Sequence, residues 1–218
     1  MSSIEELSLN LRSEDLSVRM KVLPASRSLS HADRFVLIKI AVNDPNSRIR
    51  YDAVSQLATL GREDLETTKA ILKEILHHDP EMDVRAASAD TIAALGLVEF
   101  FDDLQQIYET TSDWLMQFSV VAALGELGEP RAYDLLVKAL EHSNELVRLA
   151  AIGSLGELGN PQALELLAPL AQHPDWQVRH RVAQALANFG APALPILQQL
   201  QSDPNANVAE LAQRLCSP

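Results

Sequence analysis

Cysteine and long apolar runs are nearly absent from this chain. The single cysteine, Cys216, excludes an intramolecular disulfide framework and fits a reducing compartment. No stretch approaches the roughly 18 apolar residues that a membrane span needs. The N-terminus also lacks the basic region and apolar run of a signal peptide. We therefore expect a soluble, cytoplasmic protein without membrane insertion.

Positive charge and aromatic residues are scarce as well. The chain has 18 Lys and Arg against 30 Asp and Glu, a formal net charge of −12. Because Lys and Arg supply most of the affinity of proteins for nucleic acids, this balance argues against a nucleic-acid partner. Aromatic residues make up 5% of the chain and hydrophobic residues 47%, so the core must consist mainly of Leu, Ala, Val and Ile.

The motifs of common catalytic and metal sites are missing too. There is no Gly-rich phosphate loop, no Cys–His pairing and no hydrolase serine motif. His77, His78 and Asp79 are adjacent, but no second pair of ligands stands at zinc spacing. We expect no metal and no resident cofactor, and the sequence identifies no catalytic residues.

What the chain does contain is a segment that returns about every 31 residues. Each copy has a turn, a β-branched residue or Met, usually an Arg, and then an Ala- and Leu-rich helix. We call the place of the Arg the ladder position. It is occupied by Arg19, Arg50, Arg85, Gln117, Arg148, Arg179 and Ala209. A fixed period of this length is typical of a solenoid, in which stacked units share one core.

Each unit is predicted to contain two antiparallel helices. Apolar residues recur at spacings of three and four, which places them on one stripe of a helix. In the fifth unit the stripe of the second helix is Val147, Ala151, Ile152, Leu155 and Leu158. The pattern predicts an all-α fold, a right-handed superhelical α-solenoid of about seven helix pairs. We expect one domain over residues 1–218 with degenerate capping units at 1–30 and 200–218, and a longer connection near residues 61–66.

Two stretches of the chain resemble a known repeat. Residues 121–132, Val-x-Ala-Leu-Gly-Glu-Leu-Gly-Glu-Pro-Arg-Ala, and residues 151–163 are similar to the HEAT-like repeat of the phycobilisome lyase class. With Trp114 and Trp176 at equivalent unit starts, the plan most resembles NblB-type phycobilisome-degradation proteins of cyanobacteria, relatives of the two-subunit phycocyanobilin lyases. The resemblance implies binding to chromophorylated phycobiliproteins, phycocyanin or allophycocyanin. It also implies a role in handling or detaching bilins, with phycocyanobilin as a possible ligand.

Residues just after the ladder position are candidates for ligand contact. The second helices are expected to line the concave face, and this place holds Tyr51 and Phe118 where solvated helices usually carry Lys and Glu. An exposed apolar stripe indicates a partner surface. The alternative is that the neighbouring unit half-buries it. Asp52, next along, is a candidate to bond pyrrole nitrogens.

Trp114 and Trp176 each directly follow an Asp. Asp113 and Asp175 are plausible N-caps, with each Trp ring covering its turn. Alternatively the two rings are binding anchors at the rim of a groove.

His180 and Arg181 follow the ladder residue Arg179 and form the densest basic cluster. They would suit the two propionates of a bilin, and His180 could transfer a proton near neutral pH. The alternative is a solvated basic face. We expect the ladder arginines to bond carbonyls or an Asp of the next unit. Gln117 marks either an opening for a ligand or a drifted repeat.

Three functions therefore stay open at the level of sequence. The first is a phycobilisome-degradation factor that binds phycobiliproteins and handles or detaches bilins. The second is a lyase subunit that attaches phycocyanobilin together with a partner chain. The third is a non-enzymatic adaptor, which the missing acid–base residues favour.

Overall fold

The computed structural model describes residues 3–216, and all regular structure in that range is helical. The chain divides into two compact units, residues 1–97 and 98–218. The helices of unit 1 are α1 (Ile4–Asn10), α2 (Leu16–Met20), α3 (Val22–Ala25), α4 (His31–Ala41), α5 (Ser47–Leu60), α6 (Leu65–His78) and α7 (Met82–Leu95). The helices of unit 2 are α8 (Phe101–Thr110), α9 (Trp114–Leu127), α10 (Tyr133–Ala139), α11 (Glu145–Leu158), α12 (Ala163–Leu167), α13 (Trp176–Leu186), α14 (Leu194–Leu200) and α15 (Ala206–Cys216).

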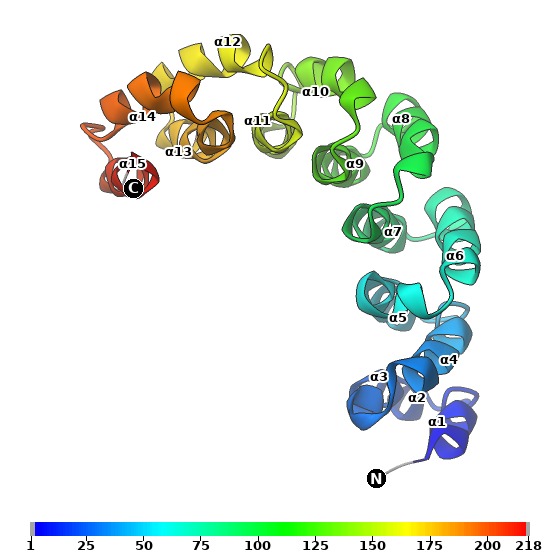
Figure 1. Ribbon diagram of the computed structural model, residues 1–218. Coiled ribbons are helices and arrows are strands. Elements are labelled where there is room, and N and C mark those ends of the chain that lie inside the picture. Colours follow the sequence, from blue (N-terminus) through cyan, green and yellow to red (C-terminus); the bar gives the residue numbers. More distant parts are fainter. Residues whose placement is uncertain (1–2, 217–218) are drawn as a thin grey trace. The chain divides into compact units, whose positions relative to one another are not determined.

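The predicted all-α solenoid of helix pairs is confirmed. Over the described residues, α1 with α2–α3 is followed by six pairs, from α4–α5 to α14–α15. In unit 2 the second helices of the pairs, α9, α11, α13 and α15, form one layer, and α8, α10, α12 and α14 form the other (Figure 1). We refer to the former as the second-helix layer. Between α9 and α11, and again between α11 and α13, the helices of this layer pack directly against each other.

The predicted apolar stripes form the core between the two layers. In α11, Val147, Ala151 and Leu155 are completely buried. Helices α9 and α11 end at Gly128 and Gly159, whose φ of 65° is the left-handed conformation that favours glycine. A glycine in the left-handed conformation therefore ends both helices and allows the chain to turn back toward the next helix.

The first pair departs from the regular pattern, and the capping role of its residues stays a prediction. Its second helix is broken into α2 and α3 around Lys21. Pro24 lies in α3 and has no N–H to donate to the preceding turn, which favours a break at this point. Residues 1–2 and 217–218, at the ends of the expected domain and caps, lie outside the described residues. The single-domain boundaries stay a prediction.

The extra residues between Arg50 and Arg85 are not where we expected them. The connection between α5 and α6 is short, with a 3-10 turn at Gly61–Glu63 and Asp64 as the N-cap of α6. Instead, α6 has 14 residues, whereas α4 has 11 and α8 has 10. The expectation of a long loop was wrong because a helix absorbs the insertion without exposing backbone groups.

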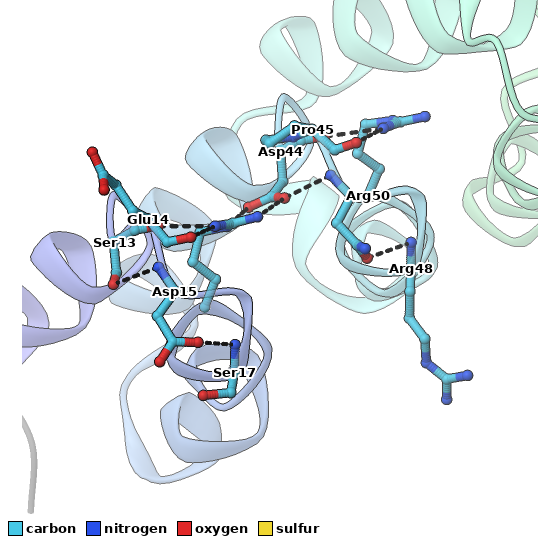
Figure 2. A network of polar contacts seen from close by, with 10 residues as sticks. Ser13, Glu14, Asp15, Ser17, Asp44, Pro45, Arg48 and Arg50 are labelled. Atoms are coloured by element: carbon cyan, nitrogen blue, oxygen red, sulfur yellow. Dashed lines mark hydrogen bonds and ion pairs between the residues drawn. The ribbon is translucent and has the colours of Figure 1, made fainter.

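The ladder arginines bond carbonyl oxygens or an Asp of the next pair, as predicted, and Arg85 does so with the carbonyl oxygen of Leu76 in α6. Arg19 donates to the carboxylate of Asp44 in the next turn at 2.8 Å and to the carbonyl oxygens of Ser13 and Glu14 at 2.9 and 3.2 Å (Figure 2). Arg50 repeats the arrangement with Asp79, at 2.7 and 2.8 Å. Arg19 and Arg50 therefore each link a helix of one pair to the turn of the following pair. The corresponding acceptor places, which we call turn positions, are Asp44, Asp79, Thr111, His142, His173 and Asp203.

Each turn position also caps its own turn. Asp44 accepts a hydrogen bond from the backbone N–H of Asn46 at 2.8 Å, and His142 accepts one through Nδ1 from Asn144 at 3.0 Å. The same bond two residues onward forms at every turn position. The side chain at a turn position thus accepts a hydrogen bond from its own turn. Where its acceptor atoms are close enough, it also accepts one from the ladder residue of the preceding unit.

Gln117 occupies the ladder position, and its side chain forms hydrogen bonds there instead of leaving a gap for a ligand. Its amide nitrogen donates to the carbonyl oxygen of Thr111 at 3.1 Å, and its Oε1 lies 2.9 Å from Nε2 of His142. Because Nδ1 of His142 accepts the N–H of Asn144, the ring proton belongs on Nε2, which donates to Gln117. Gln117 is therefore matched to a histidine at the next turn position, whereas Arg19, Arg50 and Arg179 are matched to an aspartate there.

Candidate functional site

Five of the seven predicted site residues line two cavities, one in each unit. In unit 1, Tyr51 and Asp52 of α5 line a cavity of about 270 Å³. The start of α7 closes its other side with Glu81 and Asp83, while Arg48 is the single basic residue of its lining. Tyr51 is 44% exposed, so its ring is available to a partner. This cavity is predominantly acidic.

The cavity in unit 2 has the opposite character. It has a volume of about 400 Å³ and lies between α11, α13 and α15. His180, Arg181 and Arg214 bring basic groups to it, against one acidic residue, Glu210. Its complete lining is Leu149, Trp176, Gln177, His180, Arg181, Gln184, Asn207, Glu210 and Arg214. In a chain of net charge −12 this is a local concentration of basic groups.

The expected N-caps before the two Trp residues are confirmed. Asp113 accepts the backbone N–H of Met116 at 3.0 Å, and Asp175 accepts that of Gln177 at 2.9 Å. The Trp114 and Trp176 side chains nevertheless stay 44% and 38% exposed. Trp176 lies edge-to-face against a second ring, that of His180, with centroids 6.4 Å apart. Capping is therefore the role of the Asp residues, and the Trp rings remain available for contact.

Arg181 is held in place by a neighbouring helix. Its Nε donates to the carbonyl oxygen of Leu149 on α11 at 3.2 Å. A Cβ atom at Gly153 would lie 2.0 Å from Nη2 of Arg181, so a larger residue there would displace the guanidinium from this place. Gly153 is not among the residues predicted for the site. A glycine inside a helical run is the signal that could have found it, because it often marks close packing.

Arg181 also borders a second hollow, of about 470 Å³, over α9, α11 and α13. Glu126 and Glu157 line this hollow with it, and Gly125 and Ser154 are also in the lining. Partial burial raises the pKa of the Glu157 carboxyl, and the charge of Glu126 adds to that, while Arg181 opposes it. Arg181 therefore stands between the basic cavity on one side and two carboxylates on the other.

The apolar stripe expected after the ladder position is discontinuous. Phe118 is half-buried, and with Trp114 it lies on α9 outside the linings of both cavities. Several equivalent residues are buried between helices: Ala86, Ala87, Ser119 and Ala150. The alternative interpretation, burial by the neighbouring unit, holds for these four. Among the described residues, no group of three or more His, Cys, Asp or Glu is placed to hold a metal ion. No helix of the described range has both the length and the apolar character to cross a membrane.

Comparisons with known proteins agree with this architecture. HEAT repeats match residues 34–122, 70–145 and 133–216. No curated protein matches the chain in sequence. Among solved structures, the complex of CpcE and CpcF of phycocyanin lyase from a Nostoc species is similar, at 23% identity and a TM-score of 0.60, over 99% of this chain and 94% of that chain.

Two further structures are similar to the chain at lower sequence identity. YibA of Escherichia coli has 15% identity and a TM-score of 0.60, over 99% of this chain and 92% of that one. A computationally designed armadillo repeat protein for modular peptide recognition has 21% identity and a TM-score of 0.54, over 82% of this chain and 96% of that one. These likenesses concern the fold. Because HEAT repeats match the chain from residue 34 to residue 216, the chain belongs to the HEAT-repeat family.

Proposed function

We propose that the chain binds phycobiliproteins and handles or detaches their bilins during phycobilisome degradation. The observation that carries the proposal is the basic, partly aromatic cavity at Trp176, His180 and Arg181. The likeness in fold to CpcE and CpcF, over nearly the whole chain, supports the choice of partner. So does the resemblance of residues 121–132 to the repeat of the phycobilisome lyase class.

The cavity suits the chemistry of a bilin. A bilin is a flat conjugated chain with two propionates, and Arg181 and Arg214 are placed to pair with carboxylates. Trp176 offers an exposed aromatic surface for the apolar body of the ligand. Because Gly153 and the carbonyl of Leu149 position Arg181, its guanidinium is held before a ligand arrives.

His180 is the residue we propose for proton transfer. Detaching a bilin from cysteine breaks a carbon–sulfur bond, removes a proton from the adjacent carbon and returns a proton to the thiolate. Histidine can accept and donate a proton near neutral pH. In this proposal Tyr51 and Asp52, which lie in the cavity of unit 1, and Trp114 and Phe118 on α9 contact the phycobiliprotein.

A non-enzymatic adaptor is the second candidate, and the exposed apolar residues of unit 2 favour it. Trp114, Leu146 and Trp176 are each more than a third exposed, a pattern typical of partner surfaces. An adaptor would need this surface but not the proton chemistry of His180. The third candidate, a lyase subunit that attaches phycocyanobilin, would require a second polypeptide for activity.

The test combines the purified chain with phycocyanin and, separately, with allophycocyanin. Co-elution on a sizing column measures binding, and absorbance in the bilin band measures a change in the chromophore. The expected result is a complex with a bleached or shifted bilin band. This change in the band should be lost in His180→Ala and in Arg181→Gln. Arg131→Gln is the matched control, because Arg131 is an exposed basic residue of unit 2 that pairs with Asp102 and Glu129.

Each other outcome has a defined meaning. A complex with an unchanged spectrum, unaffected by His180→Ala, would select the adaptor. A bilin transferred to apo-phycocyanin only when a second chain is added would select the attaching lyase. Absence of any complex with either phycobiliprotein would refute the proposal.

A further inference from the structure

A row of apolar side chains lines the second-helix layer of unit 2. Trp114, Leu146 and Trp176 lie in the first turns of α9, α11 and α13 and are 44%, 49% and 38% exposed. Phe118 and Leu149 are half-buried about one turn further along α9 and α11. We call these five residues the apolar row. Large apolar side chains exposed on successive helices of one layer indicate a binding surface.

The spacing of the row follows the repeat. Phe118 and Leu149 are 31 residues apart and occupy the same place in successive units, on helices that pack side by side (Figure 1). Packed helices lie about 8–10 Å apart. An extended chain advances about 3.3 Å per residue. One step from helix to helix therefore corresponds to about three residues of an extended segment laid across the row.

The end of the row at α13 and α15 is basic. The cavity beside Trp176 brings His180, Arg181 and Arg214 together against the single carboxylate of Glu210. A carboxylate that follows the apolar residues of a bound segment would reach this cluster. The charge of the cavity is thus complementary to an acidic residue, although the chain as a whole is acidic.

Three amide side chains also line this cavity: Gln177, Gln184 and Asn207. Each amide offers both a donor and an acceptor. An extended segment has backbone N–H and C=O groups that need partners, whereas a helix has already paired its own. The amide lining therefore favours an extended segment over an amphipathic helix.

We propose that the apolar row and the adjacent basic cavity bind an extended segment of a partner protein, with apolar side chains at every third residue and a carboxylate at the end that reaches α13 and α15. Trp114 and Trp176 lie two units apart and receive apolar residues separated by six positions. Arg181 and Arg214 receive the carboxylate. This inference concerns unit 2 alone and does not rest on bilin handling or on phycobiliproteins as partners. Because Arg181 and Arg214 are also the residues proposed for the bilin propionates, the segment and a bilin are alternative occupants of the same cavity.

Synthetic peptides test the proposal on the full chain. The probe is a dye-labelled peptide of about twelve residues with Leu at every third position, Ser and Gly between, and two Asp residues at one end, made in both orientations. Its control peptides have the same length, with Leu at every second position, with Leu at every seventh position, or with Lys in place of Asp. Anisotropy measures affinity. The protein has only two Trp residues, both in the apolar row, so its intrinsic fluorescence reports contact with a Trp-free peptide.

We expect one orientation of the every-third-residue Asp peptide to bind at least about tenfold more tightly than each control, because a lost apolar anchor or ion pair at a binding centre typically costs this much. Trp176→Ala and Arg214→Gln should each weaken that binding by about tenfold. Leu166→Ala is the matched control: it has the same 38% exposure as Trp176 but lies on α12, in the other layer. Arg214 is an exposed residue, so its substitution should leave the fold intact.

Several results would overturn the proposal. These are equal binding of all spacings, preference for the Lys peptide or for the helical seven-residue spacing, and an effect of Leu166→Ala as large as that of Trp176→Ala. Failure of every peptide to bind would overturn it too. Because phycocyanin is absent from this experiment, its outcome is separate from the test of the proposed function.

Discussion

Replacing Arg50 by Met should destabilise unit 1 more than the equivalent change at Arg148 destabilises unit 2. Arg50 donates two hydrogen bonds to the carboxylate of Asp79, at 2.7 and 2.8 Å, and two to the carbonyl oxygens of Asp44 and Pro45. The side chains of Arg50 and Asp79 are only 10% and 5% exposed. Without the guanidinium, Asp79 would keep the N–H of Glu81 as its partner and remain a buried charge.

The size of the difference follows from the partners. Removing one member of a buried ion pair costs about 3–5 kcal/mol. Arg148 donates to the carbonyl oxygens of His142 and Ser143, at 2.7 and 3.0 Å, and to no carboxylate in the described part of the chain. Loss of those two bonds should cost about 2 kcal/mol. We therefore expect Arg50→Met to cost about 2 kcal/mol more than Arg148→Met.

Urea unfolding followed by far-ultraviolet circular dichroism is the appropriate assay. With a slope near 2 kcal/mol per molar urea, Arg50→Met should lower the midpoint by about 2 M. Tryptophan fluorescence provides the internal comparison, because both Trp residues are in unit 2 and Arg50 is in unit 1. If the units unfold separately, the fluorescence transition should stay in place while the dichroism transition moves.

A double-mutant cycle identifies the cause. Arg50→Met leaves the buried charge of Asp79 without its partner, and Asp79→Asn removes that charge. The two changes together should therefore cost less free energy of unfolding than the sum of the single changes. Equal costs for Arg50→Met and Arg148→Met, or strict additivity in the cycle, would refute the view that the ion pair holds adjacent helix pairs together.

Three further predictions concern the ladder and the helix contacts. The hydrogen bonds from Arg179 lower the pKa of Asp203. The stabilisation by Asp203 is therefore present above the unfolded pKa of about 3.9 and is lost as pH falls through the lower folded pKa. The free energy of unfolding should accordingly fall less steeply with acid in Asp203→Asn than in the unchanged protein. His142→Asp should destabilise unit 2, and adding Gln117→Arg should restore at least about 1 kcal/mol by recreating an Arg–Asp pair; urea midpoints showing no recovery would contradict this. Gly125→Ala should lower thermal stability by about 1–3 kcal/mol, because its Cβ would lie 2.6 Å from a backbone Cα of α11; an unchanged melting temperature would show that the helices separate freely.

The repeat made much of the fold predictable, because each helix stripe and each turn recurs at one period. The bonds of Arg50 follow from this regularity, since an equivalent Asp occurs one unit later. The match between Gln117 and His142 does not, because it depends on a ring nitrogen whose proton is fixed by the backbone N–H of Asn144. The insertion before Arg85 was misplaced because a longer helix and a longer loop give the same spacing.

The site was less predictable than the fold. Equivalent places in a repeat do not indicate which residues share a cavity, and the structure assigns Asp52 to one cavity and His180 to another. Arg214 was missed because the terminal unit has lost the ladder arginine that would have drawn attention to it. The position of Arg181 depends on the absence of a side chain at Gly153, a contact between helices that periodicity does not encode.

The side chains at the turn positions cap their own turn, and several of them also bond the ladder residue of the preceding unit. This pairing affects how such a chain can change by duplication of its units. Units that carry Arg at the ladder position and Asp at the turn position, such as those of Arg50 and Asp79, have interchangeable ends and can be copied or removed singly. The side chains of Gln117 and His142 are matched to each other, so the two units that carry them keep this contact only when they are copied together. The order of the units therefore depends on matched pairs of side chains. In an array with rearranged units, the first hydrogen bonds to be lost should be those between ladder and turn positions.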